Sequence, residues 1–244
     1  LQKPYSVARK NSNPLDTQVW TGREWAKWPL SPTYFLEKYG RVKDTTAGIV
    51  PFTLREYKKQ VLRDLLTHPL VIILKARQIE ATWLIAGYAL HRANFYQGAN
   101  VIILSKGEAE AGEVLDYCRF MHSQLPLYLR AEISRNQESL LAFPAINSKI
   151  RALSATENAG IGFGGATLVI LDENDFHPFA EDNYIEIKPM IDAGGNRQLI
   201  ILSAPNRKKL GSNFKKLYTE AKAGENQFFP ISLPYNVIPE RTEK

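Results

Sequence analysis

Four apolar runs, each separated from the next by segments with helical spacing, constrain the fold more than any other feature of the sequence. The runs occupy 69–74, 100–105, 166–173 and 197–205. Their apolar residues are nearly continuous rather than alternating with polar ones, which is typical of strands covered on both faces. Because strands that alternate with helices form parallel sheets, we expect an α/β fold with a mainly parallel sheet.

The segments between these runs predict the helices that cover the sheet. The expected helices are 54–66, 84–89, 108–125, 181–193 and 212–224. We expect the fourth helix to break near Pro189 and the last to end at Gly224. Three shorter alternating pieces predict a small meander or an edge extension of the sheet, at 131–136, 139–144 and 148–155.

The two ends of the chain differ in composition from its centre. Residues 1–50 are rich in proline, aromatic and charged residues, so we expect an arm that packs on the core, with one short helix around 31–40. Its aromatic and basic residues favour packing over binding nucleic acid, namely Trp20, Arg23, Trp25, Lys27 and Trp28. We expect the core to span 51–206 and a small lid subdomain with an exit linker to span 207–244.

Composition excludes several classes of protein. A single cysteine, Cys118, rules out an internal disulfide and predicts a buried thiol in a reducing compartment, and four scattered histidines argue against a zinc site. No apolar run approaches the roughly 20 residues that span a membrane. The net charge of +6 is compatible with a polyanionic partner but is also common among ordinary soluble proteins.

The first apolar run leads into "KARQIEAT", residues 75–82, which has the layout of a phosphate-binding loop. Amide groups at the start of the next helix can bind phosphate oxygens, Lys75 can supply positive charge, and the Thr82 hydroxyl can ligate Mg²⁺. The usual loop pattern, G-x-x-x-x-G-K-[ST], is not met, because its fixed positions fall on Lys75, Glu80 and Ala81. Alone, with two of its four fixed positions missing, the loop is more typical of an ordinary strand-to-helix turn.

Two further strand ends carry compatible chemistry. Asp172 and Glu173 are the last two residues of the third run, in the pattern of a Walker B motif, where the aspartate holds Mg²⁺ and the glutamate activates water. Ser203 and Asn206 lie at the end of the fourth run, at the position of a polar residue that senses the γ-phosphate. The carboxyl ends of parallel strands share one edge of the sheet, so these residues are expected to meet there.

Together these motifs resemble the ATPase domain of the large terminase subunit of tailed bacteriophages. The resemblance covers about 50–240 and rests on "PFTLREYKKQ", "KARQIEAT", "SATENAGIGFGGATLVILDE" and "LSAPN", in that order. It implies a P-loop NTPase fold of the ASCE/RecA-like type, a three-layer sandwich. Some large terminases are similar in carrying the loop lysine at its beginning, where Lys75 stands.

The resemblance also implies a role for each residue. Arg77 and Gln78 match the family's R-Q pair, which implies that Arg77 faces the phosphates or Glu173. We expect Thr82 and Asp172 on Mg²⁺, Glu173 as the catalytic base, and Ser203 and Asn206 in coupling. Bound ATP is expected to contact Lys75, Ala76, Arg77, Gln78, Ile79, Glu80, Ala81 and Thr82 in the loop and Phe52, Tyr57 and Gln60 on the adenine side.

The same resemblance implies partners and a location. Large terminases hydrolyse ATP to move double-stranded DNA into a procapsid, with a portal protein and a small terminase subunit as partners. They act in the host cytoplasm as a homo-oligomeric ring, with five subunits as the expected number, and no membrane is involved. Metal-binding acids of the family's nuclease domain would lie beyond residue 244, so this chain is expected to hydrolyse ATP but not to cut DNA.

Two residues depart from the family pattern. Glu80 stands where glycine is usual, and a carboxylate about 4 Å from a phosphate charge costs on the order of 4 kcal/mol at an effective dielectric constant of 20. No arginine precedes the Walker B motif, where related motors supply a residue to the neighbouring subunit, and Ile161 occupies that position. We expect Arg130, Arg135 or Arg151 to substitute, or hydrolysis to be slow.

Three alternative functions remain open at this point. Superfamily 2 helicases and translocases share these motifs. A scaffold that has lost nucleotide binding would explain Glu80 and the absent arginine. A nuclease could use the acidic residues of "DENDF", but Asp172, Glu173 and Asp175 leave one strand end together and no second acidic strand is evident.

Overall fold

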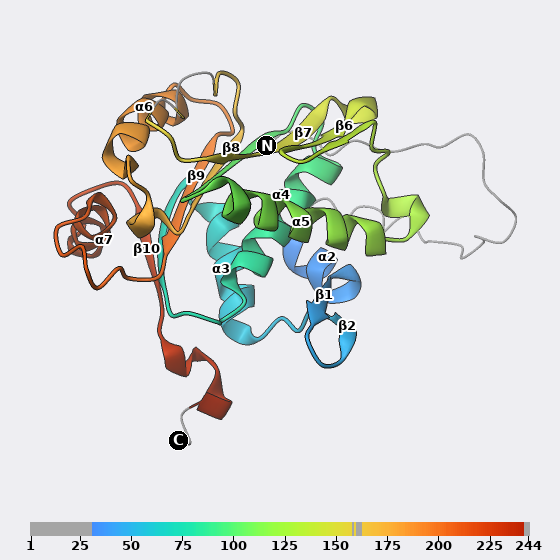
Figure 1. The fold of residues 1–244 in the computed structure, drawn as a ribbon, viewed down its shortest axis with the longest axis horizontal. Coiled ribbons are helices and arrows are strands. Elements are labelled where there is room, and N and C mark those ends of the chain that lie inside the picture. The colour runs from blue at the N-terminus through green and yellow to red at the C-terminus, as the bar shows by residue number, and fades with distance from the viewer. Residues whose placement is uncertain (1–30, 158, 160–162, 242–244) are drawn as a thin grey trace, which may run out of the picture.

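A computed structural model describes residues 31–157, 159 and 163–241, and its centre is one large sheet. The strand order is β10-β3-β9-β8-β4-β7-β6-β5. Figure 1 labels five of these strands, β6 to β10. Six neighbouring strands run parallel: β10 (Phe229–Leu233), β3 (Leu70–Lys75), β9 (Gln198–Ser203), β8 (Leu168–Asp172), β4 (Asn100–Ser105) and β7 (Ser148–Ser154). The expected mainly parallel α/β sheet is therefore confirmed.

Helices cover both faces of the sheet, which makes three layers (Figure 1). One face packs against α2 (Pro32–Tyr39), α3 (Glu56–Thr67), α4 (Ala81–Phe95) and α5 (Glu108–Gln124). The other packs against α6 (Ala180–Asp192) and α7 (Asn213–Ala223). Successive residues of β3 contribute to different layers, because Val71 and Ile73 join the first core cluster and Leu70 and Ile72 the second. Burial on both faces explains the continuous apolar runs.

The three short alternating pieces form the edge extension that was one of the two expected arrangements. β7 pairs in parallel with β4, and β6 (Leu140–Phe143) and β5 (Arg135–Gln137) then add antiparallel strands outside it. The extension lies at the edge of the sheet that is remote from β3.

Helix α6 corrects one expectation, because it continues through Pro189 to Asp192. A proline removes the hydrogen bond to the carbonyl four residues earlier, here that of Ile185. The side chain of Ile185 is among the most exposed large apolar groups, so this position faces water, which can satisfy the carbonyl. The break is avoided because the proline falls on the solvent side, near the end of the helix.

Both flanking regions contribute to the main body of the protein. Phe35 and Leu36 of α2 are buried in the first core cluster, and Leu36 packs so closely on Gly87 of α4 that a Cβ atom there would lie 2.6 Å from its Cδ2. β1 (Arg41–Asp44) and β2 (Gly48–Pro51) form a separate antiparallel hairpin. The arm residues Trp20 to Trp28 lie outside the described residues.

Part of the expected lid region, 207–244, belongs to the main sheet. Its strand β10 pairs in parallel with β3 over five residues, and Leu233 at its end accepts a 2.8 Å hydrogen bond from the Ala76 amide. The sheet therefore extends beyond the expected boundary at 206. Within the described residues, no helix is both long and apolar enough to cross a membrane.

Cys118 of α5 lies where α5 packs against α4. The thiol is fully buried, its Sγ atom lies 3.3 Å from the Ala86 carbonyl oxygen of α4, and burial raises its pKa to about 12. The thiolate is the reactive form of cysteine. We predict that the native protein does not react with 5,5′-dithiobis(2-nitrobenzoic acid) at pH 8, and that labelling follows the global unfolding transition in urea. Rapid labelling without urea would show that α4 and α5 separate.

Candidate functional site

The segment between β3 and α4 is a tight loop with two residues in the left-handed backbone region. Gln78 has φ 59° and Glu80 has φ 57°, a conformation that glycine adopts without strain and other residues adopt rarely. Neighbouring segments hold the loop from outside. The Tyr57 hydroxyl donates a 2.7 Å hydrogen bond to the Ile79 carbonyl, and Arg241 Nη2 donates one of 2.6 Å to that of Gln78.

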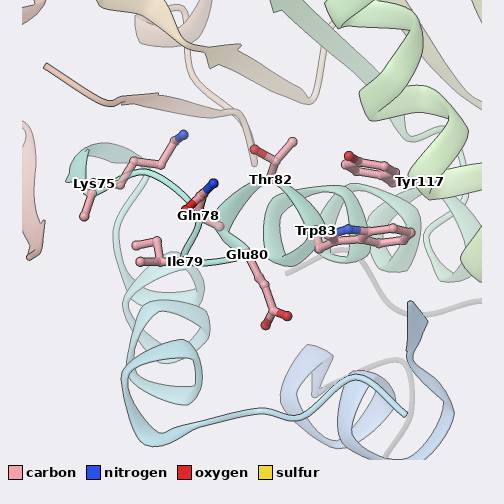
Figure 2. Close-up of a pocket in the computed structure, with 9 residues that line it drawn as sticks. Lys75, Gln78, Ile79, Glu80, Thr82, Trp83 and Tyr117 are labelled. Carbon is pink, nitrogen blue, oxygen red and sulfur yellow. The ribbon is translucent and has the colours of Figure 1, made fainter. Parts of the chain in front are cut away.

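A pocket of about 320 Å³ lies at this loop and takes in Trp83 and Tyr117 as well as loop residues. Figure 2 shows Lys75 and Thr82 extending to the same side of the loop, whereas Glu80 extends to the opposite side. The ring of Trp83 stacks on that of Tyr117, with centroids 3.9 Å apart. An ammonium, a hydroxyl and the first amides of α4 therefore border one space, which is the chemistry that binds phosphate.

Glu80 does not place its charge in that space. Its carboxylate contacts the Lys58 ammonium of α3, and the exposed fractions of the two side chains are 52% and 1%, respectively. Burial lowers the pKa of Lys58, and its contact with Glu80 opposes that shift. Two features reduce the electrostatic penalty expected for a carboxylate beside phosphate. The Glu80 side chain extends away from Lys75 and Thr82, and its charge is neutralised by Lys58.

The acidic pair lies across β9 from the loop lysine. Lys75 Nζ is 2.5 Å from Glu173 Oε1, and the Lys75 side chain is only 7% exposed. The other oxygen of Glu173 accepts hydrogen bonds from the Ala204 amide at 3.1 Å and the Ser203 hydroxyl at 3.3 Å. The ends of β3, β8 and β9 thus meet through one carboxylate.

Asp172 is a buried carboxylate with spare coordinating capacity. Desolvation raises its pKa to about 7, and the nearby Lys75 charge partly opposes this. Its Oδ1 atom is buried and has no hydrogen-bond partner among the described residues. A desolvated carboxylate oxygen beside a phosphate-type loop fits a divalent cation, since Mg²⁺ prefers oxygen ligands. Among the described residues no three acidic, histidine or cysteine side chains form a metal cage.

Ser203 and Asn206 connect the acidic segment to the region after β9. The Ser203 hydroxyl accepts a 3.1 Å hydrogen bond from the Asp175 amide, and the Asn206 amide donates one of 2.6 Å to Asp175 Oδ2. Asn206 acts here through its backbone, because its side-chain oxygen accepts from the Lys208 amide. Lys215 of α7 lies 3.4 Å from the same Asp175 oxygen.

Sequence reasoning missed Asp175 and Lys215 as parts of this network. Asp175 was considered only as a metal ligand of a nuclease, and its carboxylate is instead fully buried beside Lys215 and Asn206. Lys215 falls in a basic run that is typical of a solvated helix face. The acidic residues that follow β8 were the only sequence signal for this contact, because Lys215 lies forty residues after Asp175.

The three residues expected on the adenine side do not gather at the loop. Tyr57 contacts it, as described. Phe52 is buried, with Lys58 Nζ 4.3 Å from its ring centroid, so that face of the ring is covered. Gln60 lies on the exposed surface of α3, where its amide bonds Asp64 and Arg63 one turn away. Tyr57 and Gln60 are three residues apart on α3, yet only Tyr57 contacts the loop, whereas Gln60 bonds residues of its own helix.

Positive charge near the acidic pair comes from two more residues. Arg77 is exposed at the turn of the loop. Lys106 follows β4 and pairs with Glu110 at 2.8 Å. The pKa of Lys106 is raised mainly by Glu110 and to a smaller extent by Glu173, whereas Arg77 lowers it. Lys106 thus lies within electrostatic reach of the site, and nothing in its sequence context distinguished it.

The arginines considered for action on a neighbouring subunit lie in different places. Arg130 donates to the Ser123 and Leu125 carbonyls at 2.5 and 2.7 Å, which ties it to its own chain. Arg135 lies exposed on β5, the outermost strand. Arg151 lies on β7, which is separated from β5 by β6. Ile161 lies outside the described residues.

Comparisons with known proteins agree with this geometry. Residues 72–237, well over half of the chain, match the family model described as terminase large subunit, T4likevirus-type, N-terminal. Among solved structures, the large terminase of bacteriophage HK97 is 20% identical with a TM-score of 0.68, over 85% of this chain and 43% of its own. The chain thus spans less than half of that relative.

Two other solved structures give the same result. The ATPase domain of a Thermus phage large terminase is 18% identical with a TM-score of 0.60, over 79% of this chain and 86% of its own. A large terminase of a thermophilic bacteriophage in complex with ADP is 10% identical with a TM-score of 0.59, over 77% of this chain and 47% of its own. The expected RecA-like fold is confirmed, and the chain belongs to the family of N-terminal regions of T4likevirus-type terminase large subunits.

Proposed function

We propose that this chain binds Mg·ATP at the β3–α4 loop and hydrolyses it to drive double-stranded DNA into a viral procapsid. The observation that carries the proposal is the ion pair between Lys75 and Glu173, at 2.5 Å. Thr82 lines the same pocket as Lys75, and Asp172 ends β8 directly before Glu173. Family membership favours a packaging motor over a helicase, and a Glu80 side chain directed away from Lys75 weakens the case for a scaffold that has lost its nucleotide site.

The loop residues divide the work of binding. Lys75 supplies a nearly buried charge, which acts strongly because few waters screen it. The first amides of α4 supply donors at the end of the helix where its dipole favours negative charge, whereas the Ala76 amide is taken up by the Leu233 carbonyl. Arg77 and Lys106 extend the positive field towards solvent. Tyr57 keeps the loop in place rather than contacting the base.

A magnesium ion would be held by the Thr82 hydroxyl and the Asp172 carboxylate, together with oxygens of the nucleotide. When bound, such an ion neutralises charge that develops on the transferred phosphoryl group. Asp172 must be ionised to serve as a ligand, and burial makes its ionised form costly in the nucleotide-free protein. Nucleotide and metal are therefore expected to bind together.

Glu173 is the proposed general base, and the chain restrains it before nucleotide binds. One of its oxygens pairs with Lys75 and the other accepts from Ser203 and the Ala204 amide. A phosphate oxygen that pairs with Lys75 removes one restraint while Ser203 and Ala204 keep the carboxylate in place. Glu173 can then accept a proton from the attacking water. Movement at Ser203 would reach Asn206 and α7 through Asp175.

The partners follow from the family and are part of the proposal. Double-stranded DNA, a portal protein and a small terminase subunit are the proposed partners of a homo-oligomeric ring, with five subunits expected, on the procapsid in the host cytoplasm. The net charge of +6 and an exposed basic segment, 207–209, are compatible with contact to DNA phosphates. An exposed arginine such as Arg135 would be supplied to a neighbouring site.

We predict that binding and hydrolysis separate in two variants. Lys75→Met removes charge at the phosphates and should weaken Mg·ATP binding by at least about tenfold, whereas Glu173→Gln should bind within about threefold of wild type. Glu173→Gln should lower the rate of phosphate release by about 10² to 10⁴. Calorimetric titration and a phosphate-release assay measure the two effects.

The control for these variants is Glu181→Gln, which makes the same change at an exposed position in the first turn of α6. It should leave binding and hydrolysis unchanged. A Glu173→Gln variant that hydrolyses ATP at the wild-type rate would contradict the assignment of the base. Failure of the wild type to bind Mg·ATP would favour a scaffold.

We predict that Asp172→Asn stabilises the metal-free protein while it weakens Mg·ATP binding. The folded protein holds a proton on Asp172 up to about pH 7, whereas the unfolded chain releases it near pH 4. The wild type therefore loses stability as pH rises between these values, and the variant does not. The gain in free energy of unfolding should be small at pH 4.5 and reach a few kcal/mol, on the order of 1–4, at pH 8.

Urea denaturation in the presence of EDTA at the two pH values measures this gain. An equal gain at both would show that Asp172 is not desolvated as described. Asp182→Asn, an exposed substitution on α6, is the matched control.

A further inference from the structure

The backbone conformation of Glu80 is unfavourable for a residue with a side chain. With φ 57°, Glu80 adopts the left-handed conformation that glycine would adopt without strain. A side chain in this region costs on the order of 1 kcal/mol or more and persists only where the surroundings hold it. Something outside the loop must therefore stabilise this backbone conformation.

Lys58 is placed to do so, and its contact with Glu80 is not an ordinary surface ion pair. The Lys58 side chain is 1% exposed. Its ammonium also donates a 2.8 Å hydrogen bond to the Thr53 carbonyl and lies 4.3 Å from the centroid of the Phe52 ring. These two partners hold the lysine in one position, so its contact with Glu80 is directional. Surface pairs in which both side chains move contribute little by comparison.

The neighbouring residue of α3 supports the next residue of the loop. Tyr57 bonds the Ile79 carbonyl and Lys58 contacts Glu80, so two successive residues of one helix hold two successive residues of the loop. Figure 2 shows that Glu80 extends to the side opposite Lys75 and Thr82. The support is therefore behind the loop and leaves the phosphate-binding side open.

We propose that Lys58 is a positioning residue for nucleotide binding, which acts through its ion pair with Glu80 to hold the loop where a relative with glycine relies on backbone freedom. The inference rests on the proposed function, because it concerns the same loop. It has a specific consequence: the need for Lys58 should disappear when residue 80 is glycine, since glycine adopts the left-handed conformation unaided.

Four proteins test this: the wild type, Lys58→Met, Glu80→Gly and the double variant. Calorimetric titration with Mg·ATP should show Lys58→Met at least about tenfold weaker than wild type, and the double variant within about threefold of it. Methionine preserves most of the buried volume of lysine. Rescue by glycine is the decisive outcome, because a purely structural role of Lys58 in α3 would not depend on residue 80.

The matched control is Lys59→Met, on the same helix. Lys59 also forms an ion pair, with Glu37 at 2.7 Å, but that partner belongs to α2 rather than the loop. It should bind Mg·ATP as the wild type does. Glu80→Gln changes an exposed side chain and removes only its charge, so it tests the same pair if Lys58→Met fails to fold; we expect it to bind about three- to tenfold more weakly.

Hydrogen exchange in the nucleotide-free proteins separates this inference from the proposed function. The amides of Ala76 and Leu84 at the two ends of the loop donate to the Leu233 and Glu80 carbonyls at 2.8 and 3.1 Å. Their exchange should be at least about tenfold faster in Lys58→Met than in Lys59→Met. This readout remains valid if the wild type fails to bind ATP, which would count against the proposed function alone.

Two results would overturn the inference. The first is a Lys58→Met protein with wild-type affinity for Mg·ATP and wild-type exchange at Ala76 and Leu84. The second is a Lys58→Met protein that loses affinity and is not rescued by Glu80→Gly, because Lys58 would then act by another route.

Discussion

The ion pair between Lys75 and Glu173 is the interaction on which the rest of the site depends. It joins the end of β3 to the residue after β8, two strands that are separated in the sheet by β9. This strand order brings loop, acidic pair and Ser203 to one edge, although almost one hundred residues separate the two charges in the sequence. A lysine buried to this extent needs a counter-charge, and Glu173 provides it.

The pair also shows how a loop with an altered motif keeps a positive charge at the strand ends. Because the positive charge comes from the end of β3, position 81 need not carry lysine and can instead be a buried alanine at the start of α4. The second alteration, Glu80, is accommodated on the other side of the loop by Lys58. The departures at positions 80 and 81 are thus each matched by a specific contact elsewhere in the chain.

Local signals in the sequence were sufficient for the sheet and for the residues at its edge. Continuous apolar runs identified β3, β4, β8 and β9, because burial on both faces leaves a pattern within each strand. The same strands end in the site residues, so predicting the sheet also placed Lys75, Asp172 and Ser203 near one another.

Features that depend on distant partners could not be predicted in this way. In the sequence, Lys58 is one more charged residue of an amphipathic helix, and only the tertiary structure shows its burial against Phe52. The placement of β10 beside β3, the Asp175–Lys215 contact and the outward position of Gln60 likewise depend on tertiary packing. Local hydrophobic periodicity carries no information on such pairings.

The most direct test of the central claim is a crystal structure of this chain with Mg²⁺ and a non-hydrolysable ATP analogue. The account predicts phosphate oxygens within hydrogen-bonding distance of Lys75 Nζ, the metal ion on Thr82 and Asp172, and a Glu173 carboxylate that has lost Lys75 but kept Ser203. An analogue bound elsewhere, or phosphates at the loop with the Lys75–Glu173 pair intact, would contradict it.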